Sequence, residues 1–323
     1  GCAEVRTEKL FMEILYPCAR GAGGDAASSP SRARRWIPSV EHASSSGATR
    51  PHMQRAPQWV HALIFHLLMA DARLPAVHEA PPLEGEEPLP LALLSHGNET
   101  FAGFYCFLAG ELASRGYVVA MLEHTDGSCT GLRSAKGVER VFGERRPEAV
   151  GKPSHVVRTE DVTAALDYLE AHRGSMLGGG GDDSAAPRGA LDAIMARLDL
   201  SAGALLVGHS LGGMTMYTAL PREPARLAAG LAMDPYCIPL RLDEPREHDF
   251  VPIVQGQTPF VGPPPQPVIT LVAKASTVPF RPLIPAIFDI CLQATECIHS
   301  HQRRVFPAAA ALSSVEVPNR LRS

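Results

Sequence analysis

Residues 204–220 constrain the fold of this chain more than any other segment. Ala204-Leu205-Leu206-Val207 is an apolar run typical of a buried strand, and residues 211–220 are expected to form a helix. Gly208-His209-Ser210-Leu211-Gly212 joins the two, and glycine is needed wherever a tight turn brings backbone segments close together. The segment therefore predicts a strand, a sharp turn at Ser210 and a helix, in that order.

Apolar runs alternate with helical segments along most of the chain. Continuous apolar strands separated by helices are typical of a mostly parallel central sheet flanked by helices on both faces. With the sharp turn at Ser210, this pattern predicts an α/β protein of the α/β-hydrolase fold. Strands are expected at 10–16, 89–97, 117–124, 204–210, 230–234 and 267–273, and helices at 101–115, 157–171 and 211–220.

We expect one α/β-hydrolase domain over residues 1–323. The chain begins at Gly1 without an initiator methionine, so no targeting peptide is visible, and cytoplasmic and secreted locations both stay open. No apolar stretch approaches the roughly 20 residues that span a bilayer. Segments rich in glycine, serine, aspartate or proline predict surface loops at 18–35, 41–57, 174–189 and 255–267, and an irregular C-terminus at 303–323.

The balance of charges argues against nucleic acid as a partner. The chain carries a formal net charge of -4, and its basic residues form no broad cluster. His299 and His301, without a nearby cysteine pair, are thin evidence for a metal site, so we expect neither a metal nor another cofactor. The seven cysteines are scattered and lack C-x-x-C spacing, which leaves the redox compartment open.

Ser210 stands where a nucleophile would be presented at the edge of the sheet. The following helix begins with unpaired backbone N–H groups, that of Leu211 first, and such donors stabilise the oxyanion of a tetrahedral intermediate. A second donor is expected from the loop after the strand 89–97, where Asn98 is the candidate. His96, in the same loop, is expected to be a core histidine bonded to backbone.

An orienting carboxylate and a histidine complete this chemistry, in the order serine, acid, histidine. Asp234 ends the expected strand 230–234 at the same sheet edge, where its carboxylate would hold an imidazole in the required tautomer. A simple turn beginning at Asp234 is the alternative. The later histidines are His248, His299 and His301, of which His248 is the weakest candidate because it lies among arginine and glutamate residues.

Several motifs connect these residues to a known family. Ser95-His96-Gly97 ends the strand 89–97, residues 123–128 read E-H-T-D-G-S, and residues 208–213 read G-H-S-L-G-G. With Leu15-Tyr16-Pro17 and Trp36-Ile37-Pro38, these motifs resemble the platelet-activating-factor acetylhydrolases of the plasma and type II intracellular kind. The likeness covers most of the chain from Leu10 to Gln302.

The resemblance implies a reaction and a set of site residues. It makes Ser210 the nucleophile, Asp234 the acid and His301 the base, with the amides of Leu211 and Asn98 as oxyanion donors. The implied reaction is calcium-independent hydrolysis of short or oxidised sn-2 acyl chains of phospholipids. The chain departs from the family at Asn98, where an apolar residue is usual, and after His301, where the acidic and aromatic continuation is missing.

Residues 59–70 resemble the surface helix through which this family binds lipid aggregates. Their i, i+3, i+4 spacing favours an amphipathic helix, which implies peripheral contact with a membrane or lipoprotein surface. An ordinary core helix would have the same periodicity, so that alternative stays open. The expected apolar face consists of Trp59, Val60, Leu63, Ile64 and Leu67.

Two other functions stay open. A general carboxylesterase or polyester hydrolase would share the turn at Ser210, and a catalytically inactive hydrolase-fold protein that binds lipid would share the fold. The E-H-x-D-x-S pattern favours the phospholipid esterase. The sequence indicates neither the oligomeric state nor the preferred acyl length and head group.

Overall fold

The structure is a computed structural model, which describes part of the chain. The residues that it describes form two compact units, an N-terminal unit, Gly1–Ala202, and a C-terminal unit, Gly203–Ser323. The single domain expected over 1–323 stays a prediction. The described residues are 1–6, 10–18, 33–35, 73–98, 100–129, 131–134, 137–141, 145–177, 189–235, 266–273 and 315–317.

The N-terminal unit contains strands built around the parallel pair β5 (Leu89–Ser95) and β6 (Val118–Glu123). β6 also pairs antiparallel with β2 (Phe11–Leu15), which pairs antiparallel with β1 (Cys2–Arg6). The short strand β9 (Leu198–Asp199) pairs in parallel with β5. The loop after β5 and the segment after β6 therefore leave the same edge of a parallel pair.

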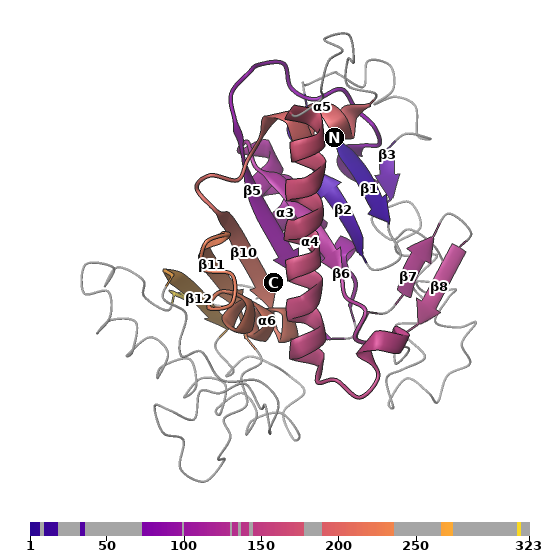
Figure 1. Cartoon of the computed structure of the whole chain (residues 1–323), viewed down its shortest axis with the longest axis vertical. Helices are drawn as coiled ribbons and strands as arrows, with labels where there is room; N and C mark the ends of the chain where they lie inside the picture. Colours follow the sequence, from indigo (N-terminus) through magenta and orange to yellow (C-terminus); the bar gives the residue numbers. More distant parts are fainter. Residues whose placement is uncertain are drawn as a thin grey trace, which may run out of the picture. The chain divides into compact units, whose positions relative to one another are not determined.

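Both faces of β5 and β6 are covered. Consecutive residues are buried in each strand, from Leu91 to Leu94 and from Val118 to Leu122, which requires packing on either side. The helices α3 (Cys106–Ser114) and α4 (Ser154–Leu177) pack on the strands of this unit. Figure 1 shows α4 across the front of the strands and α3 behind them. A 3-10 helix, η2 (Ala102–Tyr105), leads into α3.

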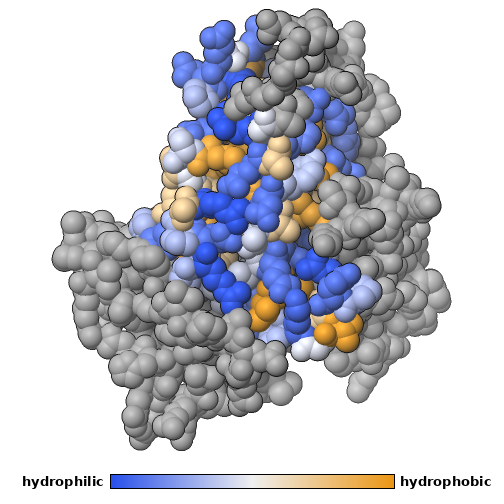
Figure 2. Space-filling model, in the orientation of Figure 1, coloured by the Kyte–Doolittle hydropathy of each residue, from blue (hydrophilic) through white to orange (hydrophobic). Residues whose placement is uncertain are grey.

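Helix α4 buries charged as well as apolar side chains. Val162, Leu166 and Leu169 are buried at helical spacing, and Arg158 and Asp161 are buried with them. In the same orientation as Figure 1, Figure 2 shows mainly hydrophilic residues along the outward face of the helix. The buried charges of α4 therefore face the strands, where they need polar partners.

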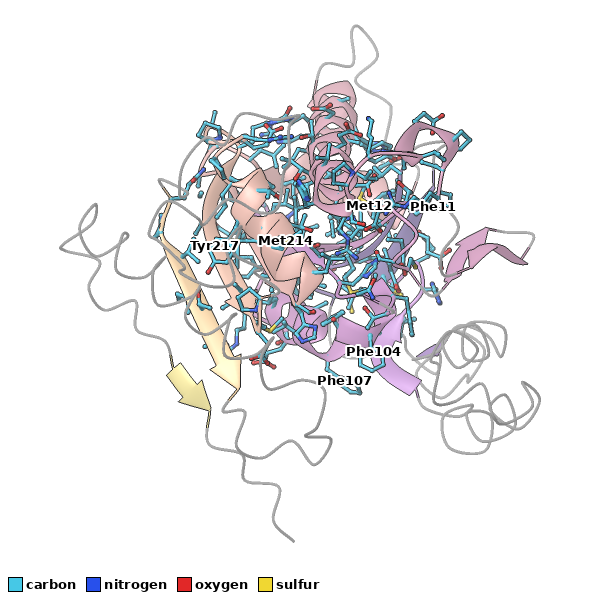
Figure 3. The ribbon with its side chains drawn as sticks, turned by 90° about the horizontal axis from the view of Figure 1, so that it is seen from below. Phe11, Met12, Phe104, Phe107, Met214 and Tyr217 are labelled. Carbon is cyan, nitrogen blue, oxygen red and sulfur yellow. The ribbon has the colours of Figure 1, made fainter. Side chains whose placement is uncertain are left out.

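The C-terminal unit begins with the strand, turn and helix that the sequence predicts. Helix α6 (Leu211–Ala219) packs on the first two strands of the unit, and Figure 3 shows Met214 and Tyr217 on this helix. The hydroxyl of Tyr217 lies 2.7 Å from Oγ1 of Thr270 on the third strand. The described strands pair in parallel in the order β10 (Ala204–His209), β11 (Leu227–Met233), β12 (Val268–Ala273) and β13 (Val315–Val317).

These elements confirm the predicted fold class. Every strand and helix that the sequence predicts within the described residues is present, with its ends displaced by a few residues. The strands are mostly parallel, and helices cover them, as the continuous apolar runs indicated. The chain has the α/β arrangement in which ligands commonly bind at the carboxyl ends of the parallel strands.

Two short strands lie where the sequence predicted irregular structure. β3 (Ala33–Arg35) falls within the predicted loop 18–35 and pairs antiparallel with β4 (Arg73–Val77). β13 falls within the predicted irregular C-terminus, 303–323, and pairs with β12. A neighbouring strand satisfies the backbone hydrogen bonds in both cases, so such a short segment needs no apolar periodicity of its own.

Helix α4 continues past the residue where its composition predicted an end. The glycine-rich loop expected at 174–189 is wrong at its start, because α4 extends to Leu177, and residues 178–188 lie outside the described residues. A single glycine within a helix costs only about 1 kcal/mol, which packing elsewhere along α4 offsets.

The expected loops 41–57 and, for the most part, 255–267 lie outside the described residues. Several elements have no predicted counterpart. They are the strands β1, β4 and β9, the hairpin β7 (Gly131–Ser134) and β8 (Gly137–Val141), the 3-10 helix η3 (Pro147–Ala149) and α5 (Ala190–Arg197).

The predicted lipid-contact segment, 59–70, lies outside the described residues, with Trp59, Val60, Leu63, Ile64 and Leu67. Its amphipathic helix stays a prediction. Among the helices that the structure describes, none combines the length and the apolar composition needed to cross a bilayer.

Candidate active site

Ser210 occupies the turn between β10 and α6 in a strained backbone conformation. Its φ is 52° and its ψ is -116°, a region that residues with a side chain rarely adopt. The N–H of Ser210 donates to the carbonyl of Met233 at 2.9 Å, and its carbonyl accepts the N–H of Met214 at 3.2 Å. A serine held this way between a strand and a helix has the geometry of a nucleophile elbow.

Two glycines make this turn sterically feasible. A Cβ on Gly208 would lie 2.1 Å from the carbonyl oxygen of Gly212, and a Cβ on Gly213 would lie 2.7 Å from the Cβ of Pro235. Neither position accepts a side chain unless the backbone moves. The N–H of Leu211, at the first position of α6, has no acceptor within the helix, and donors of this kind stabilise an oxyanion.

Asp234 directly follows β11, the strand next to β10. His209 is in register with Met233 in this parallel pair, so Ser210 and Asp234 leave neighbouring strands at the same edge. The φ of Asp234 is 41°, also in the left-handed region. Burial lowers the pKa of His209, and the nearby charge of Asp234 partly opposes this shift. The C-terminal unit thus brings the predicted nucleophile and the predicted acid together.

The remaining predicted site residues fall in two places. His301, with the alternatives His248 and His299, lies outside the described residues. Asn98 is described: it follows β5 in the N-terminal unit, and it is exposed. The catalytic roles of all these residues stay predictions.

The loop after β5 is anchored by buried groups. His96 is fully buried, its Nδ1 donates to the Gly97 carbonyl at 2.6 Å, and its Nε2 accepts the N–H of His124 at 3.2 Å. The predicted core histidine bonded to backbone is therefore confirmed. Burial first, and the charge of Arg158 second, lower the pKa of His96 well below its ordinary range, so its ring is neutral. The N–H of Gly97 donates to the Tyr105 hydroxyl at 3.1 Å.

The E-H-x-D-x-S segment, residues 123–128, is mostly buried, and its His124 N–H donates to His96 of this loop. Asp126 accepts hydrogen bonds from Ser128 and from Nε of Arg158, the latter at 3.0 Å. Arg158 also donates to two carbonyls of the loop after β5. Arg158 was not among the residues predicted from motifs, because it lies on α4, far along the chain. The available signal was a charged residue on an otherwise apolar stripe of the predicted helix.

A second Ser–His–Asp arrangement lies inside the N-terminal unit. Ser95 Oγ is 2.7 Å from His124 Nε2, and His124 Nδ1 is 3.1 Å from Asp161 Oδ2. Asp161 also accepts bonds from Thr125 and Arg146. The three hydrogen-bonded residues of this arrangement are each at most 2% exposed, so a substrate does not reach Ser95 in the folded unit. This arrangement therefore joins β5, residues 123–128 and α4 rather than presenting a nucleophile.

Burial sets the protonation of this arrangement. It lowers the pKa of His124 well below the ordinary range, and the charge of Arg158 adds to the effect. It raises the pKa of Asp161 to about 6, against the opposing charge of Arg146. At neutral pH a neutral imidazole therefore donates through Nδ1 to an ionised carboxylate.

His96, Glu123 and Cys129 group their donor atoms within 4.8 Å of one another, a spacing compatible with a metal ion. Their donor atoms already form hydrogen bonds within the protein. His96 accepts a backbone N–H, and Glu123 accepts the N–H of Ala102 at 3.0 Å and the thiol of Cys129 at 2.9 Å. A metal would have to replace these bonds, so the three residues fit a hydrogen-bonded cluster better than a metal centre.

The strained serine between a strand and a helix, within parallel strands covered by helices, is the arrangement of the α/β-hydrolase fold. Residues 1–141 match the family model described as platelet-activating factor acetylhydrolase, isoform II. The matched residues include the Ser95-His96-Gly97 and E-H-x-D-x-S motifs and end before Ser210. The resemblance predicted from the sequence is therefore confirmed.

Curated relatives match a longer part of the chain. It is 26% identical to platelet-activating factor acetylhydrolase of Cavia porcellus over 263 residues, 75% of this chain and 55% of that protein. It is 26% identical to that of Canis lupus familiaris over 257 residues, 74% of this chain and 54% of that protein. The chain spans about half the length of these relatives. A solved ferulic acid esterase from Streptomyces cinnamoneus is 19% identical, with a TM-score of 0.48 over 95% of this chain and 64% of that one.

Gly208→Ala is expected to abolish the reactive geometry of Ser210. The added Cβ would meet the backbone of Gly212, so the turn must open and Ser210 must move. Since misplacing a reacting group by about 1 Å costs on the order of 100-fold in rate, labelling by a fluorophosphonate probe should slow by about that factor. Labelling rates are measured by gel fluorescence.

Gly110→Ala is the matched control for this substitution. A Cβ at Gly110, on α3, meets no atom within 4 Å, so the labelling rate should stay that of the parent chain. Equal labelling rates for Gly208→Ala and Gly110→Ala would contradict the steric role of Gly208.

Acidification from about pH 7.5 to about pH 6 should destabilise the fold. His96 and His124 stay neutral when folded and take up protons only on unfolding, because their folded pKa values lie below the ordinary range. The stabilisation is therefore complete above about pH 6.5 and is lost below it. Together the two histidines should lower the free energy of unfolding by about 1–2 kcal/mol, measured by urea denaturation.

Asp161 acts in the opposite direction at lower pH. Its folded pKa of about 6 lies above the ordinary 3.8, so its protonation adds to the stability of the folded state as the pH falls from about 6 to 3.8. Measurements between about pH 7.5 and about pH 6.5 therefore report mainly on the histidines. His124→Gln should remove about half of the joint contribution of His96 and His124 in that range, and an undiminished dependence would show that His124 is not a group responsible.

Proposed function

We propose that this protein is a serine esterase with Ser210 as its nucleophile. The observation that carries the proposal is the strained backbone of Ser210 at the start of α6, with φ 52°. Such strain persists only where the surrounding structure holds it, and it clusters at reactive sites. Similarity to platelet-activating factor acetylhydrolases supports the same class of reaction.

In the proposed reaction, Ser210 Oγ attacks the acyl carbonyl while His301 takes the hydroxyl proton. The carbonyl oxygen becomes an oxyanion, which the N–H groups of Leu211 and Asn98 stabilise, and Asp234 orients the imidazole. The ester C–O bond then breaks, and His301 returns the proton to the leaving alcohol. Water attacks the acyl-serine by the same steps and releases the acid and the free enzyme.

The substrate that we propose is a phospholipid with a short or oxidised sn-2 acyl chain, as for a 1-alkyl-2-acetylglycerophosphocholine esterase. Two findings support it: the name of the curated relatives, and the E-H-x-D-x-S segment at residues 123–128. The reaction as written needs neither calcium nor another cofactor. Serine supplies the nucleophile, and backbone N–H groups stabilise the developing charge.

Residues 59–70 are proposed to bind the lipid surface on which such a substrate is found. Their apolar residues recur at helical spacing, which favours an amphipathic helix lying in the interface. The contact would be peripheral, with a membrane or a lipoprotein. This proposal is independent of the proposed catalytic residues.

Hydrolysis should depend on Ser210 and favour short-acyl phospholipids. A panel of 1-alkyl-2-acetyl, oxidised-acyl and long-acyl phosphocholines with p-nitrophenyl acetate gives the comparison, by release of acid and of chromophore. Ser210→Ala should reduce turnover of every substrate by at least about 1,000-fold. His301→Ala should cause a similar loss, whereas His299→Ala should retain activity.

Other outcomes of this panel favour the alternatives. Ser210-dependent turnover of simple esters without phospholipid turnover indicates a general carboxylesterase. Folded protein without any Ser210-dependent turnover indicates an inactive lipid-binding protein and overturns the proposal. Loss of activity in His299→Ala alone would make His299 the base.

Trp59→Ala combined with Val60→Ala should weaken binding to phosphatidylcholine vesicles by about 10-fold while sparing hydrolysis of p-nitrophenyl acetate. Both residues would leave the interface, whereas a soluble ester needs no surface. Vesicle binding is measured by co-sedimentation. Unchanged binding, or loss of soluble-ester turnover through unfolding, would reject the surface role of this segment.

A further inference from the structure

The carbonyl of Gly97 accepts three hydrogen bonds. Its donors are Nη2 of Arg158 at 3.2 Å, Oγ1 of Thr100 at 3.2 Å and Nδ1 of His96 at 2.6 Å. Gly97 and His96 are themselves buried. Three donors therefore surround the carbonyl oxygen and hold it toward the interior of the N-terminal unit.

Arg158 is the charged member of this set, and it is rigidly held. Its side chain is fully buried and reaches four acceptors: Nε donates to Asp126 at 3.0 Å, Nη1 to the His96 carbonyl at 2.5 Å, and Nη2 to Ser128 as well as to Gly97. Asp126 balances its charge, and the guanidinium in turn holds the pKa of that carboxyl below its usual range, against the effect of burial. A planar group with five N–H donors is the one side chain able to satisfy these acceptors together.

The orientation of the Gly97 carbonyl fixes the orientation of the next amide. The C=O of Gly97 and the N–H of Asn98 belong to one peptide unit, in which the two groups point in opposite directions. A carbonyl directed inward therefore directs the N–H of Asn98 outward. Within the described part of the chain, no acceptor pairs with this N–H, and Asn98 is exposed.

We propose that Arg158 is a positioning residue of the esterase: by holding the Gly97 carbonyl inward, its guanidinium presents the N–H of Asn98 outward as an oxyanion donor. The inference rests on the proposed function and adds to it a residue that lies on another element, α4. Asp126 and Ser128 hold the guanidinium in place, which gives the E-H-x-D-x-S segment a physical role. Arg158 touches no reacting atom, so its effect must come through the geometry of the amide.

Arg158→Lys tests this role because it keeps the positive charge beside Asp126 and removes the planar fork. An ammonium does not span the four acceptors, so the amide of Asn98 loses its fixed direction. For p-nitrophenyl acetate, kcat should fall by about 10- to 100-fold with KM unchanged. A trifluoromethyl ketone, which forms a tetrahedral adduct with an oxyanion, should bind more weakly by a similar factor.

Arg146→Lys is the matched control. It makes the same change in the same buried cluster, but Arg146 contacts Asp161 and not the Gly97 carbonyl. Its kcat should stay within about 2-fold of the kcat of the parent chain, because a substitution away from the site ordinarily has an effect of about this size or smaller. Equal losses of kcat in the two variants would make the effect one of general stability and would overturn the inference.

Thr100 provides the second test if Arg158→Lys does not fold. Thr100→Val removes one of the three donors to the Gly97 carbonyl with little change of shape, and Thr100→Ser keeps it. Thr100→Val should lower kcat by about 3- to 10-fold with KM unchanged, and Thr100→Ser should restore it. Parental kcat in both Arg158→Lys and Thr100→Val overturns this inference alone, whereas a parent chain without Ser210-dependent turnover overturns the proposed function and the inference with it.

Discussion

The N-terminal unit depends most on the interactions of the buried guanidinium of Arg158. Its 3.0 Å ion pair with Asp126 is fully buried, and a buried charge deprived of its partner costs about 3–5 kcal/mol. Its remaining donors reach Ser128 and the loop after β5. One side chain therefore fixes three segments that are distant in the sequence: the loop at 96–97, residues 123–128 and α4.

Ser210 depends on a constraint of another kind, the geometry of the backbone. The register of β10 with β11 places the Met233 carbonyl where it accepts the N–H of Ser210, and the absence of a side chain on Gly208 lets Gly212 approach. In each unit, hydrogen bonds and close packing within the protein thus fix the direction of backbone groups before any substrate binds. In many enzymes, preorganised groups of this kind account for most of the stabilisation of the transition state.

Local patterns in the sequence were sufficient to predict the turn at Ser210 and the strands around it, because apolar runs and glycines act over a few residues. Arg158 and Asp161 could not be predicted from such patterns, since they meet their partners only when α4 packs on the strands. Their position on an apolar helix stripe was the one available signal. The choice of His301 over His299 came from family resemblance, because the residues around the two histidines do not distinguish them.

Trapping the acyl-enzyme is the most direct test of Ser210 as the nucleophile. The full chain is mixed with p-nitrophenyl acetate, quenched in acid during turnover, digested and mapped by tandem mass spectrometry. We predict an acetyl group on Ser210 and none on Ser95, which is buried in the second Ser–His–Asp arrangement. An acetyl group on another residue, or none on folded protein that is turning over substrate, would contradict the role of Ser210.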